Sequence, residues 1–282
     1  MPTFHAADGT ELAYHVLGAG VPLVCLPGGP MEASAYLGDL GGLSEHRRLI
    51  MLDLRGTGDS AIPADPDSYR CARMVPDIAA LQDHLGLDRS DIMAHSAGAN
   101  LALLFATHHQ QRVNKLALIA PSGRAVDLES DRAMRHEIVR LRHNEPWFAT
   151  AAAAFERIAA DQATEGDWDA VAPFFYGRWD ATAQAHAAAG EKWTNEAAGR
   201  VFFAEGSFDQ NALRVALAAF ASPVLVLAGE LDLQRPPRIE AEFAALFPAG
   251  RFVVQPGAGH YPWLDNANWF VSAVNAFLDD GR

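Results

Sequence analysis

The stretch that decides the fold reads Asp91-Ile92-Met93-Ala94-His95-Ser96-Ala97-Gly98-Ala99-Asn100-Leu101-Ala102-Leu103-Leu104-Phe105-Ala106, and its pattern changes at one serine. An apolar run typical of a strand precedes Ser96, and small and apolar residues at helical spacing follow it. A strand that enters a helix through a tight turn crowds the turn residue against the positions two before and two after it. Both positions must therefore be small, and they are Ala94 and Gly98.

This arrangement matches the strand-turn-helix pattern G-x-S-x-G, with Ala94 in place of the first glycine, which exposes a serine hydroxyl for nucleophilic attack. A serine at this position also suits the start of a helix without any chemistry. A base, an acid and donors for an oxyanion elsewhere in the chain would favour the chemical interpretation.

The composition is that of a folded acidic protein. The chain has 282 residues, 50% of them hydrophobic and 20% charged, which is enough for a full core in one large domain. Its formal net charge of −13 argues against nucleic acid and against an anionic membrane surface as partners, because both would repel it.

The sequence shows no sign of export or of a structural disulfide. Residues 1–5 lack the pattern of a signal peptide, and the longest apolar stretch, 213–229, is interrupted by Pro223. Cys25 falls in an expected strand and Cys71 in an expected loop, so we expect no disulfide framework. We therefore expect a soluble, cytoplasmic protein.

Strand and helix patterns alternate from residue 22 to residue 120, which is typical of a parallel sheet with crossover helices. A hairpin around Asp8-Gly9-Thr10 precedes them. With the strand before Ser96, strands are expected at 3–7, 11–17, 21–26, 48–53, 115–120, 223–228 and 251–255. With the helix after Ser96, helices are expected at 75–85, 209–220, 236–247 and 266–278.

A glycine turn, Pro27-Gly28-Gly29-Pro30-Met31, ends the 21–26 strand. Its glycines allow a sharp turn that points N–H groups into a crevice at the carboxyl end of the sheet, where ligands bind in open α/β folds. The Gly29-Pro30 bond is a candidate for a cis peptide.

A second glycine turn, Gly56-Thr57-Gly58-Asp59-Ser60-Ala61, matches the dinucleotide pattern G-x-G-x-x-[GA] directly after a strand. Pro63 and Pro66 disfavour the long helix that must hold the pyrophosphate. We therefore expect a structural turn, braced by hydrogen bonds of Asp53 and Arg55.

The alternation stops between Arg124 and about Glu205, where the sequence is Ala-rich and helical in propensity. We predict an inserted helical lid over 124–205, on a core formed by 1–123 and 206–282. Four of the six tryptophans fall in the lid, and they either form its own small core or roof a pocket.

Three chemically apt residues follow three expected strands, in the order Ser96, Asp232, His260. Because the carboxyl ends of parallel strands meet at one edge of a sheet, we expect these side chains to come together. The order serine, acid, histidine is the one expected for this architecture. Gly257 and Gly259 would give His260 freedom to swing over the serine. We find no metal-ligand spacing in the sequence.

The chain resembles the α/β-hydrolase family over nearly its whole length, within it most the branch of proline iminopeptidases and related peptidases and esterases. The matching stretches are the turn at 27–30, Asp53-x-Arg55-Gly56-x-Gly58-x-Ser60, the turn at 94–98, Gly229-Glu230-x-Asp232 and Gly257-x-Gly259-His260. The resemblance implies a mostly parallel eight-stranded α/β sheet with flanking helices and an inserted lid. The chain departs from the iminopeptidase motifs at Pro27, Met31 and Ala97, which stand for His, Gly and Trp.

The implied activity is that of a serine hydrolase without a cofactor or metal, acting on a small-molecule or short-peptide substrate. Ser96 would attack, His260 would carry the proton and Asp232 would orient His260. Backbone N–H groups of Gly29 and Ala97 would form the oxyanion hole. The oligomeric state is not specified by the sequence.

The substrate-binding candidates lie beside the nucleophile and in the lid. They are Met31, His95, Trp147, Trp179, Trp193, Glu191, Glu196 and Glu205. A lid glutamate would receive a substrate ammonium in an aminopeptidase, whereas the small Ala97 favours an esterase with a roomier pocket. Acyl transfer to another acceptor, thioesterase or carbon–carbon hydrolase activity, and a relative that binds ligands without turnover are the alternatives.

Overall fold

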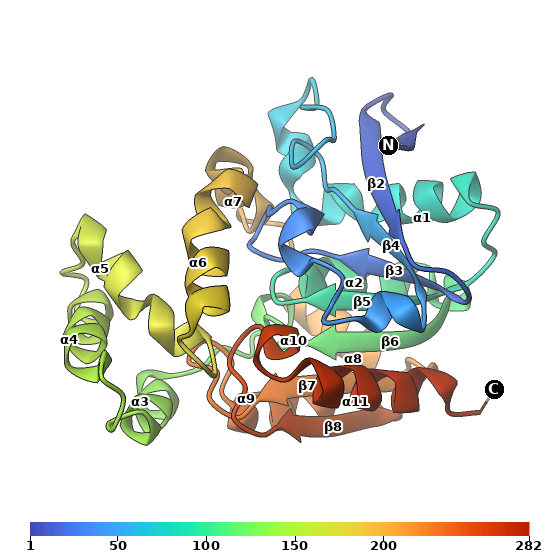
Figure 1. Cartoon of the computed structure of the whole chain (residues 1–282). Helices are drawn as coiled ribbons and strands as arrows, with labels where there is room; N and C mark the ends of the chain where they lie inside the picture. Colours follow the sequence, from blue (N-terminus) through green and yellow to red (C-terminus); the bar gives the residue numbers. More distant parts are fainter. Residues whose placement is uncertain (282) are drawn as a thin grey trace.

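A computed structural model describes residues 1–281 of the chain, which fold around one eight-stranded sheet (Figure 1). The strands are β1 (Thr3–His5), β2 (Glu11–Leu17), β3 (Pro22–Leu26), β4 (Arg48–Leu52), β5 (Ser90–His95), β6 (Val113–Ile119), β7 (Val224–Gly229) and β8 (Gly250–Gln255). Their spatial order is β1-β2-β4-β3-β5-β6-β7-β8. Only the β1–β2 and β2–β4 pairs are antiparallel. The predicted mostly parallel eight-stranded sheet is confirmed.

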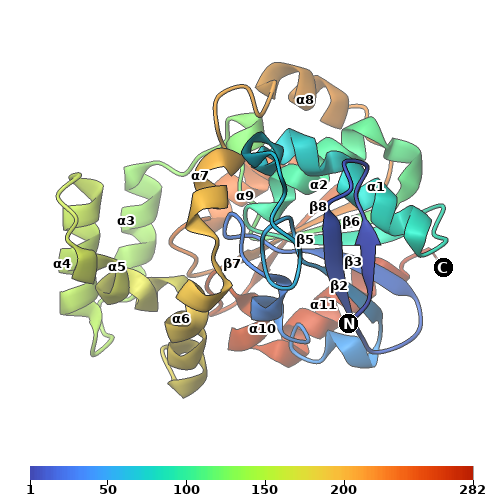
Figure 2. The same cartoon turned by 90° about the horizontal axis from the view of Figure 1, so that it is seen from above.

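The two faces of the sheet are covered by different helices, which explains why the central strands are apolar throughout. One face carries α1 (Val75–His84), α2 (Gly98–His108), α8 (Gln210–Leu217) and α9 (Pro237–Ala244). The other carries α10 (Pro262–Asp265) and α11 (Ala267–Asp279), on the opposite side in Figure 2. Every residue of β5 and β7 is buried as a result.

The segment predicted as a lid holds five helices and lies beyond the carboxyl ends of the parallel strands (Figure 1). They are α3 (Arg132–Leu141), α4 (Phe148–Ala159), α5 (Glu165–Val171), α6 (Ala181–Trp193) and α7 (Glu196–Phe202). The first three have a small core of their own around Phe155 and Phe174, which Leu233 of the main body joins. Among residues 1–281, no helix combines the length and apolar character needed to cross a bilayer.

The turn after β4 is braced as its residues predict. Asp53 is 1% exposed and accepts hydrogen bonds from Ser34 N (2.8 Å), Ser34 Oγ (2.7 Å) and Asp59 N (3.0 Å). Arg55, also buried, makes a bidentate pair with Asp77 (2.6 and 2.7 Å) and a further bond to Asp8. A Cβ at Gly58 would lie 2.2 Å from Asp53 Oδ2, so this glycine pattern serves packing.

Two expected helices end earlier than their sequence pattern predicts. The helices expected to reach residues 220 and 247 end at Leu217 and Ala244, because the last residues turn to bring Phe220 and Phe247 into the core. Cys71 lies in a buried helical turn instead of a loop, and both cysteines are free thiols.

Arg55→Ala should lower the free energy of unfolding by about 3–5 kcal/mol, because it leaves the buried carboxylate of Asp77 without its partner. Urea denaturation measures this cost. Arg132→Ala, which breaks an exposed pair with Glu156, is the control and should cost about 1 kcal/mol or less. Equal costs for the two variants would contradict the role given to Arg55.

Candidate active site

Ser96, His260 and Asp232 form one continuous chain of hydrogen bonds. His260 Nε2 lies 2.9 Å from Ser96 Oγ, and His260 Nδ1 lies 2.7 Å from Asp232 Oδ2. A carboxylate only accepts, so the Nδ1 proton of a neutral His260 points to Asp232, and Nε2 accepts from the serine hydroxyl. The other carboxylate oxygen accepts from the backbone N–H groups of Gln234 (2.8 Å) and Arg235 (3.0 Å). Both oxygens of the buried Asp232 carboxylate therefore accept hydrogen bonds from the protein.

The turn at Ser96 is strained and closely packed. Ser96 follows β5 directly, precedes α2, and has φ +49°, a conformation that non-glycine residues rarely adopt. A Cβ on Gly98 would lie 2.3 Å from the carbonyl oxygen of Pro27, and one on Gly28 would lie 2.7 Å from that of His95. The glycines are therefore required because the two turns touch through their backbones.

Two residues with free backbone N–H groups lie beside Ser96 at one cavity. Gly29, which has φ +109° before a cis peptide to Pro30, and Ala97, at the start of α2, line the same cavity as Ser96. Neither N–H has a hydrogen-bond partner within residues 1–281. We call this cavity of about 410 Å³ the serine cavity. Its charged lining residues are Arg124, Glu129, Arg135 and Arg235.

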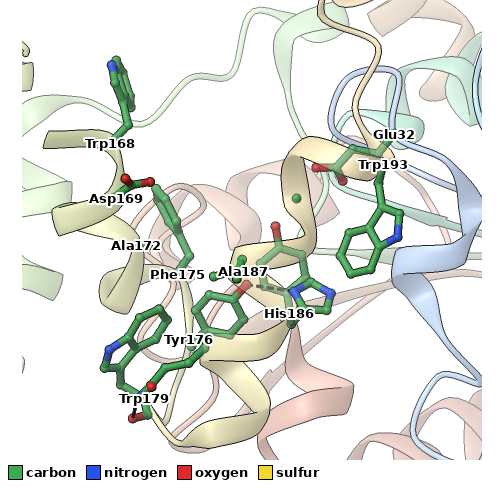
Figure 3. Close-up of a pocket in the computed structure, with 14 residues that line it drawn as sticks. Glu32, Trp168, Asp169, Ala172, Phe175, Tyr176, Trp179, His186, Ala187 and Trp193 are labelled. Atoms are coloured by element: carbon green, nitrogen blue, oxygen red, sulfur yellow. Dashed lines mark hydrogen bonds between the residues drawn. The ribbon is translucent and has the colours of Figure 1, made fainter. Parts of the chain in front are cut away.

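A second cavity, of about 510 Å³, adjoins the serine cavity, since Trp168 and Phe175 line both. We call it the aromatic cavity. Its aromatic walls are Trp168, Phe175, Tyr176, Trp179, His186, Trp193 and Tyr261. Figure 3 shows Glu32 and Trp193 on one side of it, and Trp168, Asp169 and Trp179 on the other.

His95 lies beneath the site and connects its parts. The Tyr36 hydroxyl accepts from Gly28 N (2.8 Å) and donates to His95 Nδ1 (2.6 Å). His95 Nε2 donates to the carbonyl oxygen of His260 (2.8 Å), so this ring is a neutral tautomer. Burial lowers the pKa of His95 well below its usual value, which keeps it neutral. His95, which precedes Ser96, therefore connects the glycine turn, through Tyr36, to the loop that carries His260.

The loop that carries His260 is held against the lid segment. His260 N donates to the carbonyl oxygen of Phe175 (2.7 Å), and Gly259 N and Gly177 N both donate to Asp265 Oδ2 (2.8 and 2.9 Å). A Cβ on Gly259 would lie 2.5 Å from the Phe175 carbonyl oxygen. The expectation that this glycine lets His260 swing is wrong, because it is there for close packing.

The structure places the substrate-binding candidates in three different settings. Trp179 and Trp193 line the aromatic cavity. Met31 and His95 are buried away from both cavities, and Trp147 packs on Phe174 at a ring-centroid distance of 5.0 Å and under the Arg142 guanidinium. The exposed glutamates are Glu191, Glu196 and Glu205, and neither cavity includes them. These six residues line neither cavity, and their part in substrate binding stays a prediction.

Glu32 is the carboxylate that sequence reasoning missed. It follows the glycine turn directly and lines the aromatic cavity. Burial raises its pKa from 4.5 to about 7, although His260 and Thr194 lower it. Its position next to a turn of predicted function is the signal that could have identified it.

Three potential metal ligands come together away from the triad, beside β2 and β4. They are His15, Asp53 and Asp59, with ligand atoms within 4.8 Å of one another. Asp53 already accepts three hydrogen bonds from Ser34 and Asp59, and His15 Nε2 lies 3.0 Å from it. This network explains the cluster as a brace of the turn.

An open α/β sheet with serine, acid and histidine at its carboxyl edge defines a class of enzyme folds. The family model described as alpha/beta hydrolase fold matches residues 21–267, and the chain belongs to this family. A proline iminopeptidase of Lactobacillus crispatus is 36% identical over 117 residues, 39% of this chain and 40% of that protein. A 2-hydroxy-6-oxo-2,4-heptadienoate hydrolase of Pseudomonas putida is 27% identical over 281 residues, 96% and 94% of the two chains.

The leading curated matches span only about two fifths of those relatives' length. Among solved structures, an esterase from Exiguobacterium antarcticum superposes with a TM-score of 0.74 at 20% identity, covering 99% of both chains. This likeness shows the shared fold.

Glu32→Gln should stabilise the protein more at pH 8 than at pH 5. An acid whose pKa rises from 4.5 to about 7 on folding loses stability as the pH rises through that window, because only the unfolded state ionises freely. The groups that face Glu32 are His260, Tyr36, Tyr176 and Tyr261. The glutamine variant lacks this loss, which is on the order of 2–3 kcal/mol.

The measurement is the difference in unfolding free energy between variant and wild type at each pH. Glu137→Gln, an exposed position on α3, is the control and should show no such trend. A difference for Glu32→Gln that is the same at both pH values would contradict the buried state of this carboxylate.

Proposed function

We propose that the chain is a serine hydrolase that cleaves an ester or amide bond of a small molecule or short peptide through an acyl-enzyme at Ser96. The observation that carries the proposal is the chain Ser96 Oγ, His260, Asp232, with spacings of 2.9 and 2.7 Å, beside two free backbone donors. Membership of the α/β-hydrolase fold family supports it.

The first half of the reaction forms the acyl-enzyme. His260 Nε2 takes the hydroxyl proton as Ser96 Oγ attacks the carbonyl carbon, and Asp232 stabilises the imidazolium through Nδ1. The oxyanion would accept from Gly29 N and Ala97 N, and the start of α2 adds its positive dipole end. The leaving group departs with the proton from His260.

The second half regenerates the enzyme. Water attacks the acyl carbonyl, His260 takes a proton from it, and Ser96 leaves with that proton to give the free acid. The acyl group would occupy the serine cavity, of about 410 Å³, which suits a small or medium group. The helices of segment 124–205 would act as a lid over the site, because Trp168 and Phe175 line both cavities.

Ser96→Ala should reduce turnover of an ester substrate by on the order of 10⁴-fold or more, because it removes the nucleophile. Folding should be retained, because loss of one hydroxyl removes little packing. Steady-state kinetics with purified protein measures the loss, and Ser272→Ala, an exposed serine on α11, is the control. Comparable activity of Ser96→Ala on a substrate of the wild type would refute the assignment.

Esters should be hydrolysed with a higher kcat/KM than aminoacyl anilides. The lid glutamates expected to receive a substrate ammonium are exposed, whereas Glu32 lines the aromatic cavity and is the carboxylate that the aminopeptidase alternative would use. A series of p-nitrophenyl esters against prolyl and alanyl p-nitroanilides measures the preference. A clear preference for the free-amine anilide, lost in Glu32→Gln and kept in Glu137→Gln, would make the chain an aminopeptidase.

A further inference from the structure

The formal charges that line the aromatic cavity are all negative. Glu32 and Asp169 line it, and no lysine or arginine does. His186 is neutral, because Nε2 donates to the carbonyl oxygen of Tyr36 (3.1 Å) and Nδ1 accepts from the Tyr176 hydroxyl (2.8 Å; dashed in Figure 3). Burial lowers the pKa of His186, which keeps the ring uncharged.

Glu32 has no ion-pair partner among residues 1–281, and its half-buried side chain lies at the wall of this cavity. A buried carboxylate without a cation is costly, and it binds a proton or a cation when one is available. The raised pKa of about 7 reports that cost. A ligand cation in the cavity would remove it.

The aromatic side chains favour the same kind of ligand. The faces of tryptophan and tyrosine rings attract cations through their negative quadrupole, and aromatic cages bind alkylated ammonium groups. Trp179 and Trp193 stand on opposite sides of the cavity (Figure 3). Tyr176 stacks on Tyr261 with ring centroids 5.0 Å apart. The volume of about 510 Å³ accommodates an alkylammonium group.

The aromatic cavity lies beside the loop that carries His260. His260 gives its proton to the leaving group, so that group must lie next to the imidazole. Tyr261, which follows His260, lines the aromatic cavity, and so does Phe175, whose carbonyl oxygen accepts from His260 N. The acyl carbon stays on Ser96, at the serine cavity.

We propose that the aromatic cavity binds an alkylammonium group carried by the alcohol portion of the ester substrate, against Glu32. The inference rests on the proposed serine hydrolase function. The bond from Ser96 Oγ to the acyl carbon forms as the ester C–O bond breaks, and the amino alcohol leaves with the proton from His260 and with its ammonium unchanged. Water then releases the acid from Ser96.

The test compares two esters that differ in charge and not in shape. Butyrylcholine and 3,3-dimethylbutyl butyrate share the acyl group, and a carbon replaces the charged nitrogen in the second. We expect the wild type to prefer the cationic ester in kcat/KM by about 10-fold or more. Glu32→Gln should reduce this ratio several-fold, whereas Glu137→Gln, which is exposed on α3, should leave it unchanged.

Equal kcat/KM for the two esters, with hydrolysis that depends on Ser96, would overturn the cation site and leave the serine hydrolase proposal intact. Absence of hydrolysis of any ester would instead count against the proposed function. In that case a titration with choline, followed by tryptophan fluorescence, decides the cation site alone. A saturable change that Glu32→Gln weakens supports the site, and no change in the wild type overturns it.

Discussion

The contact between two backbone turns is the constraint on which the site depends. The turn after β3 and the turn after β5 meet where neither Gly28 nor Gly98 has room for a Cβ. This contact brings Gly29 N, Ala97 N and the hydroxyl of Ser96 to one cavity wall. A side chain at either glycine would push the two turns apart, and Gly29 and Ala97 with them away from Ser96.

The segment between β6 and β7 contributes to the position of the base as well as to the walls of the cavities. Phe175 accepts from His260 N, and Asp265 holds Gly177 and Gly259 together. The backbone of His260 is therefore held at both its polar groups. Its carbonyl oxygen accepts from His95, and its N–H donates to Phe175 of the inserted segment. Movement of the inserted helices would therefore shift the imidazole of His260.

Two carboxylates near His260 differ because their surroundings differ. Asp232 receives two backbone N–H groups and the imidazole, which compensate its burial. Glu32 lines a cavity whose walls are largely aromatic. Asp232 is thus satisfied by hydrogen bonds of the protein, whereas no lysine or arginine lines the cavity beside Glu32.

The sequence alone determined the order and type of the strands, the tight turn at Ser96 and the positions of Asp232 and His260 at strand ends. Those features follow from local patterns: apolar runs, small residues around a turn, and glycines after strands. The tertiary structure alone decided which side chains face a cavity. Glu32, five residues after Pro27, is not among the substrate-binding candidates of the sequence and lines a cavity, whereas Glu191, Glu196 and Glu205 are among them and are exposed. The reason is that the direction of a side chain on a loop or helix depends on what packs around that element, and those contacts come from residues far away in the chain.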